Sequence, residues 1–254
     1  MTGTTIGSVR ILGAAFFSTH HASAQDLLAG RERAFTPPSY GLLVGRARRF
    51  TSLLTQMHIE VCGALQSIAA EPPIAVFATC HGEIQTAAKL LSEFREGAMV
   101  SSARFALSVH NTASGLYSVA IGSNAPTTTV TGANAIAAGW LEASLTALEA
   151  QQTVLLSIAD EPVPPALQGP TGVGAAAAFL LGFAPGAGRA AQLVVAPSID
   201  ERSESGGSGP DINPLQVLAR AVDAATRDEA ATVPLGRIQP GATLELRFPE
   251  DARA

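Results

Sequence analysis

The sequence is short of charge, cysteine and aromatic side chains, and each shortage narrows the classes of protein that it can encode. Charged residues make up 15% of the 254 residues and the formal net charge is −5, which gives no electrostatic basis for binding nucleic acid. Cys62 and Cys80 are too few for a disulfide framework. Apolar runs such as 172–184 are shorter than the ~20 residues that cross a bilayer, so we expect no membrane span.

The start of the sequence also lacks the basic segment and apolar core of a secretory signal, so we expect a cytoplasmic protein. Hydrophobic residues reach 47% of the chain. A chain so apolar and so poor in charge often hides part of its surface in a permanent interface. We expect neither a cofactor nor a metal ion.

Hydrophobic periodicity predicts an alternation of strands and helices in the first hundred residues. Residues 8–17 and 74–79 have the character of strands, and residues 49–68 and 83–96 have apolar positions at helical spacing. This alternation indicates an α/β fold with a mostly parallel sheet covered by helices.

Residues 101–161 contain the feature around which the chain is organised. A β-branched strand leads through a tight corner, Thr131–Asn134, into an Ala-rich helix that ends at Glu149. Many α/β enzymes hold a nucleophile at such an elbow, because the helix N-terminus stabilises negative charge. Here the elbow consists of Gly132, Ala133 and Asn134, none of which is an ordinary nucleophile.

The last third of the chain is predicted from shorter patterns. Residues 174–183 and 192–197 are apolar runs spaced like a hairpin, and residues 200–210 are typical of a flexible surface loop. Residues 214–227 predict a helix, and residues 243–248 alternate as a last strand.

Two pairs of neighbouring residues suggest other chemistry. His20 and His21 could bind a metal, but ligands at suitable spacing are lacking, and a solvated loop is the favoured interpretation. Cys80 and His81 could form a thiolate pair, yet consecutive strand residues point to opposite faces, so a buried cysteine at a strand end is favoured.

Charged clusters remain open to two interpretations. Asp160 and Glu161 could do acid–base work, although the following Pro162 favours a turn. A basic cluster near the N-terminus could meet a carrier-protein phosphate or an acidic partner, although a solvated loop is favoured. Its members are Arg31, Arg33, Arg46, Arg48 and Arg49.

Several single residues have structural interpretations. We expect Asn111 to cap the helix that follows it and His110 to be packed in the core. Gly115 and Gly139 are predicted to be packing positions where elements approach closely, and Trp140 could belong to the core or to an interface.

Several features in order resemble the N-terminal half of β-ketoacyl synthases, and more closely the truncated chain length factors of aryl polyene and related pigment clusters. The matching features are Gly82, the run Ser101–Asn111 ending in SVHN, Gly115, Pro126, the elbow, and the strand LLSIADEP. The resemblance covers residues 8–197 and implies a thiolase-like α/β fold. Residues 1–254 would then form a single ketosynthase-like N-terminal domain, with 198–254 a less certain C-terminal extension.

The resemblance also implies that catalytic groups are missing. An ungapped match from Asn111 places the ketosynthase cysteine on Asn134, and counting back from Val154 places it on Ala133, and neither has a thiol. The two family histidines follow the cysteine, whereas all five histidines here precede Asn134. The chain would therefore be a non-catalytic subunit. The alternatives are an acyltransferase or hydrolase with another nucleophile, such as Cys80 or a nearby serine, and an acyl-binding homodimer.

As a chain length factor, the chain would form a heterodimer with a full-length β-ketoacyl synthase, and an acyl carrier protein would visit the complex. The strand Thr127–Val130 would be the pairing edge, with Thr128 and Val130 at the interface. Arg104 or Phe105 would reach across to close the partner's acyl pocket. Their bulk would limit the length of the growing chain.

Overall fold

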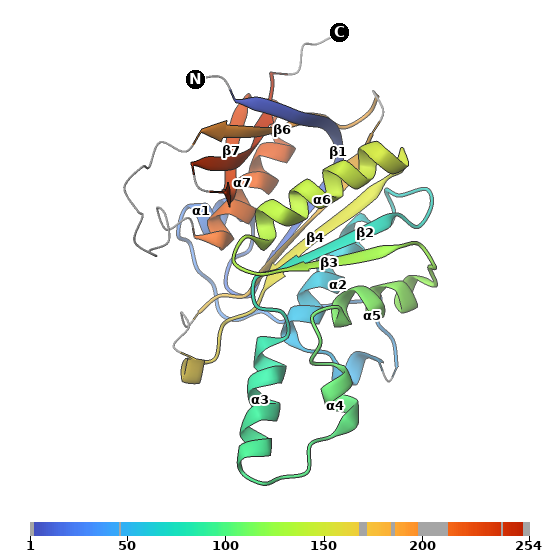
Figure 1. Cartoon of the computed structure of the whole chain (residues 1–254), viewed down its shortest axis with the longest axis vertical. Helices are drawn as coiled ribbons and strands as arrows, with labels where there is room; N and C mark the ends of the chain where they lie inside the picture. The colour runs from blue at the N-terminus through green and yellow to red at the C-terminus, as the bar shows by residue number, and fades with distance from the viewer. Residues whose placement is uncertain are drawn as a thin grey trace.

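The computed structural model describes residues 3–45, 47–167, 172–183, 186–197, 213–239 and 241–250. Within these residues, eight strands form one sheet in the order β3-β2-β4-β5-β1-β6-β8-β7 (Figure 1). The strands are β1 Thr4–Ser18, β2 Ile74–Thr79, β3 Thr127–Thr131, β4 Val154–Asp160, β5 Ala175–Gly182, β6 Arg189–Pro197, β7 Ala231–Gln239 and β8 Ala242–Phe248. The predicted loop 200–210 lies outside the described residues.

Helices cover both faces of the sheet, which confirms the predicted α/β class. They are α1 Ala24–Leu28, α2 Leu53–Leu65, α3 Ile84–Arg95, α4 Ser102–Ala106, α5 Thr112–Ile121, α6 Ala135–Ala150 and α7 Pro214–Thr226, with 3-10 turns at Ala47–Phe50 and Pro165–Leu167. None of the helices in the described ranges has the length and hydropathy of a membrane span.

The prediction of a mostly parallel sheet was wrong. Only β2 pairs in parallel, with β3 on one side and β4 on the other, and the remaining neighbours are antiparallel. Parallel neighbours need a crossover connection, usually a helix, and α3 to α5 and α6 supply this between β2, β3 and β4. By contrast, β8 begins three residues after β7 ends, and β5 follows β4 with no α-helix among the described residues between them.

The predicted hairpin of β5 and β6 was also wrong. Ser18 to Arg10 of β1 pair with β5, and Ile11 to Thr4 pair with β6 on the other side. The 15 residues of β1 are long enough for its second half to pair with β5 on one side and its first half to pair with β6 on the other side.

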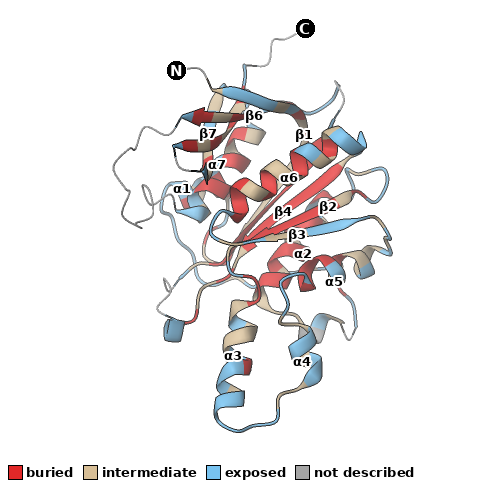
Figure 2. Cartoon of the chain, in the orientation of Figure 1, coloured by how far each residue is buried: buried red, intermediate tan, exposed pale blue. Residues whose placement is uncertain are grey.

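Two hydrophobic cores lie on opposite faces of the sheet, because side chains alternate along each strand. On β2, Val76 and Ala78 face the core under α6 and α7, while Ala75 and Phe77 face the core under α2 and α5. Figure 2 shows the buried residues concentrated along the central strands and these helices. Trp140 of α6 is fully buried, so it belongs to the core and not to an interface.

The two edges of the sheet differ in how they are protected. The β7–β8 hairpin extends the sheet beyond β6, and its outer strand β7 carries Pro234 and two register shifts. Proline and bulges prevent an edge strand from pairing with another chain. The opposite edge strand, β3, has neither feature and pairs only with β2 among the described residues. Thus β3 is the open edge.

Candidate functional site

The predicted elbow is present at the end of β3. Gly132 has a φ of +117°, a backbone conformation that favours glycine, and its carbonyl accepts a hydrogen bond from the Ala135 amide at 2.9 Å. Asn134 is the N-cap residue of α6, but its side chain makes no capping bond, and both Ala133 and Asn134 are exposed. The elbow therefore presents a methyl group and an amide, which cannot form an acyl-enzyme. Which of the two positions corresponds to a ketosynthase cysteine stays a prediction.

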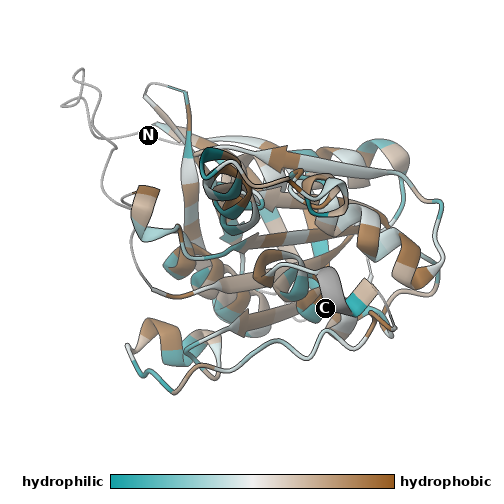
Figure 3. Cartoon of the chain, turned by 90° about the horizontal axis from the view of Figure 1, so that it is seen from below, coloured by the Kyte–Doolittle hydropathy of each residue, from teal (hydrophilic) through white to brown (hydrophobic). Residues whose placement is uncertain are grey.

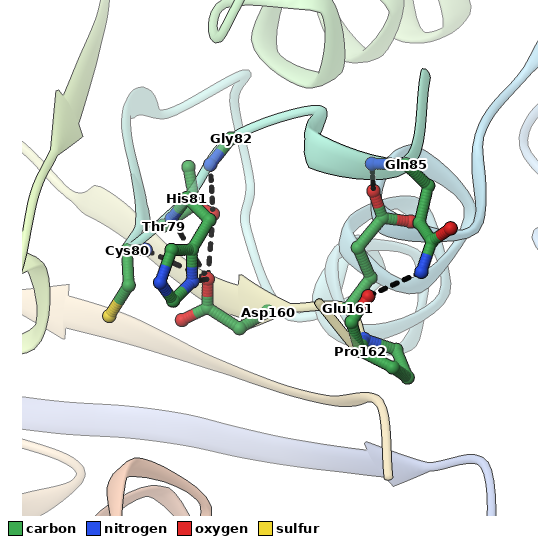
Figure 4. Close-up of polar contacts among 8 residues, drawn as sticks. All are labelled: Thr79, Cys80, His81, Gly82, Gln85, Asp160, Glu161 and Pro162. Atoms are coloured by element: carbon green, nitrogen blue, oxygen red, sulfur yellow. Dashed lines mark hydrogen bonds and ion pairs between the residues drawn. The ribbon is translucent and has the colours of Figure 1, made fainter. Parts of the chain in front are cut away.

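The carboxyl ends of β2 and β4 bring together Cys80, His81 and Asp160 (Figure 4). Asp160 Oδ1 accepts hydrogen bonds from the Thr79 hydroxyl at 2.9 Å and the Cys80 amide at 2.8 Å. The His81 ring lies 3.9 Å from the same oxygen. Asp160 thus holds the turn after β2, which confirms a structural use of this carboxylate.

The electrostatics of this turn oppose a thiolate at Cys80. Burial and the negative charge of Asp160 raise the pKa of the Cys80 thiol well above its ordinary value. A nucleophilic cysteine needs the opposite environment, with a nearby positive charge that lowers the thiol pKa. We therefore interpret Cys80 as a structural residue at the end of the strand, although it is half-buried and not fully buried as the sequence favoured.

Glu161, the residue after β4, was predicted to lie in a turn and instead joins two helices. Its Oε1 accepts the Gln85 amide of α3 at 3.0 Å, and its Oε2 accepts the Leu54 amide of α2 at 3.3 Å (Figure 4 draws the first). Burial raises the pKa of Glu161 to about 7, and burial also raises the pKa of the nearby Glu83.

A cavity of about 370 Å³ lies beside this cluster and is lined by Cys80, His81, Asp160, Glu161 and the start of α7. Its two carboxylates already accept backbone amides. The described residues contain no group of three or more His, Cys, Asp and Glu side chains that could hold a metal ion.

The segment 84–107, here called the arm, projects from the body of the molecule and carries two of the predicted interface residues (Figure 1). Arg104 Nη1 pairs with Glu93 Oε1 of α3 at 2.5 Å, while the neighbouring Phe105 is 63% exposed. Thr128 is exposed on the open edge β3, and Val130 is partly buried against the core. Contact of these four residues with a partner stays a prediction.

The predicted solvated loop at the two histidines was wrong. His21 is buried with its Nδ1 3.1 Å from the Ser18 hydroxyl, and the His20 Nδ1 lies 2.8 Å from the Thr19 hydroxyl. The Thr19 amide bonds to the Gly174 carbonyl, and this anchor draws the segment against the body.

The basic cluster is partly occupied by contacts within the chain. Arg31 pairs with Asp26 at 2.7 Å, Arg33 donates to the Ser18 carbonyl at 3.3 Å, and Arg48 lies over the Tyr40 ring. These contacts support a structural use of the cluster. Arg46 and the Arg49 side chain lie outside the described residues.

Some of the predictions for single residues are confirmed and others were wrong. Asn111 is the N-cap residue of α5 but makes no side-chain cap bond, and His110 is exposed, so a core role for His110 was wrong. Open space surrounds the Cβ position of Gly115, which was wrongly predicted to be a packing position. Gly139 is confirmed as one, because an added Cβ would lie 2.7 Å from the Cβ of Ala78.

Sequence reasoning missed two buried polar groups. Glu83 accepts a hydrogen bond from the Thr55 hydroxyl at 2.7 Å, and His58 Nδ1 lies 2.8 Å from the Ser157 hydroxyl. Glu83 is the first residue of the predicted helix 83–96, where a carboxylate is common, and that position was the available signal. His58 has apolar neighbours in a helix, with no pattern that indicates its partner.

The mixed sheet, the elbow and the buried α6 define a thiolase-like α/β fold with an elbow that lacks a nucleophile. The family model "Beta-ketoacyl synthase, N-terminal domain" matches residues 29–232. The chain belongs to this family.

Solved structures agree on the fold. The structure titled "Ketosynthase (ApeO) in Complex with its Chain Length Factor (ApeC) from Xenorhabdus doucetiae" matches with a TM-score of 0.70 and 18% identity, over 94% of this chain and 99% of that chain. "The ishigamide ketosynthase/chain length factor" matches with a TM-score of 0.58 and 16% identity, over 77% of this chain and 69% of that chain. A search of curated proteins found no match.

Proposed function

We propose that this chain is a non-catalytic chain length factor, which pairs with an active β-ketoacyl synthase and shapes the tunnel for its acyl chain. The observation that carries the proposal is the elbow, where Ala133 and Asn134 lie between the end of β3 and the start of α6. Claisen condensation needs a thiolate to carry the acyl chain. A family member with the elbow and no nucleophile contributes shape.

Both solved structures described above are titled as a ketosynthase with a chain length factor. Their fold is shared by this chain, and this likeness supports a ketosynthase partner. By extension we propose that the pathway is fatty-acid-like or aryl polyene polyketide synthesis and that an acyl carrier protein delivers substrate to the complex.

The segment that lies between β2 and β3 in the sequence supports pairing through this part of the molecule. Six large hydrophobic side chains of this segment are exposed: Leu91, Phe94, Met99, Phe105, Val109 and Val119. In Figure 3 the molecule is viewed from the end at which the arm projects, and hydrophobic residues recur there among hydrophilic ones. We call these six residues and β3 the pairing face. Exposed apolar side chains and an open edge strand are both typical of a protein–protein interface.

Within the pairing face, Arg104 and Phe105 are proposed to reach the partner's acyl pocket. Arg104 is steadied by Glu93, and the exposed ring of Phe105 is free to fill apolar space on the partner. A larger side chain at either position would shorten the product, and a smaller one would lengthen it.

The test is co-expression of the untagged chain with a tagged ketosynthase encoded beside it, followed by affinity and size-exclusion chromatography. We expect a one-to-one complex that Thr128→Lys abolishes, because the added cation lies on the open edge strand. Leu145→Lys is the matched control, since Leu145 is an exposed hydrophobic residue on α6. A chain that elutes as its own dimer would favour the acyl-binding homodimer, and elution as a monomer would contradict pairing altogether.

A further inference from the structure

At its first turn the arm is hydrogen-bonded to the body, where the Gln85 amide donates to Glu161 and the Gln85 side chain donates to the Pro162 carbonyl. α3 packs on α4, and Leu90 is the one buried residue among the described residues of α3. The N-terminal turn of α3 meets the N-terminal turn of α2, and the amides of both turns lack partners within their own helices. The chain also returns to the body after Leu107, so this junction fixes the end of the arm at which α3 begins.

Two buried carboxylates make the junction. Glu161 accepts one backbone amide from each helix, Gln85 at 3.0 Å and Leu54 at 3.3 Å. Glu83 accepts the Thr55 hydroxyl of α2 and, at 3.3 Å, the Thr86 hydroxyl of α3. Glu83 and Glu161 are 2% and 4% exposed. A single carboxylate, that of Glu161, therefore bridges the backbones of α2 and α3.

We propose that Glu161 is a positioning residue that sets the arm against the body, and that the arm is held more firmly when Glu161 carries a proton than when it carries a charge. The two helix N-termini stabilise the negative charge of Glu161, because they attract an anion. Burial and the negative charges of Glu83 and Asp160 destabilise the charge of Glu161. Asp160 in turn lies 3.9 Å from the His81 ring.

The balance between these effects gives the direction of the pH dependence. Burial raises the pKa of Glu161 from 4.5 to about 7, so burial and like charge outweigh the helix termini. When the arm swings away, water reaches Glu161 and its pKa returns toward 4.5. The open form then binds its proton more weakly, so opening is promoted as pH rises. From these two pKa values the opening equilibrium increases on the order of 25-fold between pH 5.5 and pH 8.

The consequence for function rests on the proposed function, since the arm carries Phe105 and Met99 of the pairing face. A looser arm at high pH would present these side chains less well to the ketosynthase. The test below uses this chain alone, so it can fail while the co-purification succeeds, and the reverse also holds.

Amide hydrogen exchange followed by mass spectrometry tests the proposal on the full chain between pH 5.5 and pH 8, corrected for intrinsic exchange. We expect exchange of amides 86–95 to show opening that increases tenfold or more with pH, while amides of β2 do not change. Glu161→Gln should flatten this profile. Glu60→Gln is the matched control, because Glu60 accepts a hydrogen bond from the Tyr40 amide at 2.6 Å, in a part of the molecule outside the arm. This variant should leave the profile unchanged.

Two results would overturn the proposal. One is an arm in the unaltered protein whose corrected exchange does not vary with pH, a result that needs no variant to fold. The other is a folded Glu161→Gln protein that keeps the full pH dependence.

Discussion

A Cβ atom added at Gly139 would lie 2.7 Å from the Cβ of Ala78, so α6 crosses β2 at a distance that only glycine permits. This contact fixes the helix that follows the elbow against the strand that leads to Cys80. The position of the elbow therefore depends on packing, and it is preserved in a chain without a nucleophile there.

Gly139→Ala should lower the free energy of unfolding by about 1–3 kcal/mol, because an overpacked contact outweighs the gain in helix propensity. Gly115→Ala is the matched control, since Gly115 also lies in a helix but has open space around its Cβ position. It should raise the free energy of unfolding by about 0.5–1 kcal/mol. Urea unfolding followed by circular dichroism measures both, and equal effects of the two variants would contradict the packing argument.

Cys80 should react slowly with iodoacetamide at pH 7, because its raised pKa leaves almost no thiolate. We expect the alkylation rate of the folded chain to be at least tenfold below that of the urea-unfolded chain. Peptide mapping separates Cys80 from Cys62, whose pKa is raised to about 12 by burial. Rapid alkylation of Cys80 with a midpoint below pH 8 would revive the alternative of a cysteine nucleophile.

His58 and Glu161 should affect stability with opposite signs as pH falls. Burial lowers the pKa of His58 from 6.5 to about 3, so the unfolded chain binds the extra proton and stability is lost as pH falls below 6.5. The raised pKa of Glu161 means that the folded chain binds the extra proton, and stability is gained as pH falls from 7 to 4.5. The two contributions oppose each other between about pH 4.5 and 6.5.

Glu161→Gln should therefore expose the effect of His58. Between pH 6.5 and 4.5, stability of this variant relative to the unaltered protein should fall by about 1.4 kcal/mol per pH unit. Adding His58→Gln should remove the corresponding loss. Urea unfolding at a series of pH values measures these slopes, and parallel curves for the unaltered protein and Glu161→Gln would contradict the raised pKa.

Phe105→Ala should lengthen the product of a reconstituted ketosynthase complex, because removal of an exposed ring leaves space at the proposed end of the acyl pocket. Arg104→Ala should act in the same direction and more weakly, since it also frees Glu93. Phe35→Ala, which removes an exposed ring outside the pairing face, is the control. Chromatography of the released products gives the lengths, and an unchanged distribution with both Arg104→Ala and Phe105→Ala would remove the tunnel role.

Local features of the fold could be predicted from the sequence. The strand 74–79 and the helix 83–96 have clear periodicity and sharp ends, and the structure has them at Ile74–Thr79 and Ile84–Arg95. The elbow followed from a strand, a glycine corner and an Ala-rich helix in direct succession. Such patterns depend only on residues that are close together in the chain, so a single sequence is enough to predict these elements.

The arrangement of these pieces could not be predicted in the same way. β1 lies between β5 and β6, more than 150 residues later in the chain, and no local pattern encodes that neighbourhood. Glu161 meets Leu54 across a separation of 107 residues, so its adjacent proline suggested only a turn. His21 was judged by its polar sequence context, but the distant carbonyl of Gly174 accepts the amide of Thr19, two residues before His21, and holds this segment against the body.

The most direct test of the central claim is to challenge the co-purified complex with a radiolabelled acyl thioester and to ask which chain becomes acylated. The account predicts that the ketosynthase takes the label and that this chain, with Ala133 and Asn134 at its elbow, takes none. Stable labelling of this chain, mapped to Cys80 or to a serine beside it, would contradict the account and identify the chain as an enzyme.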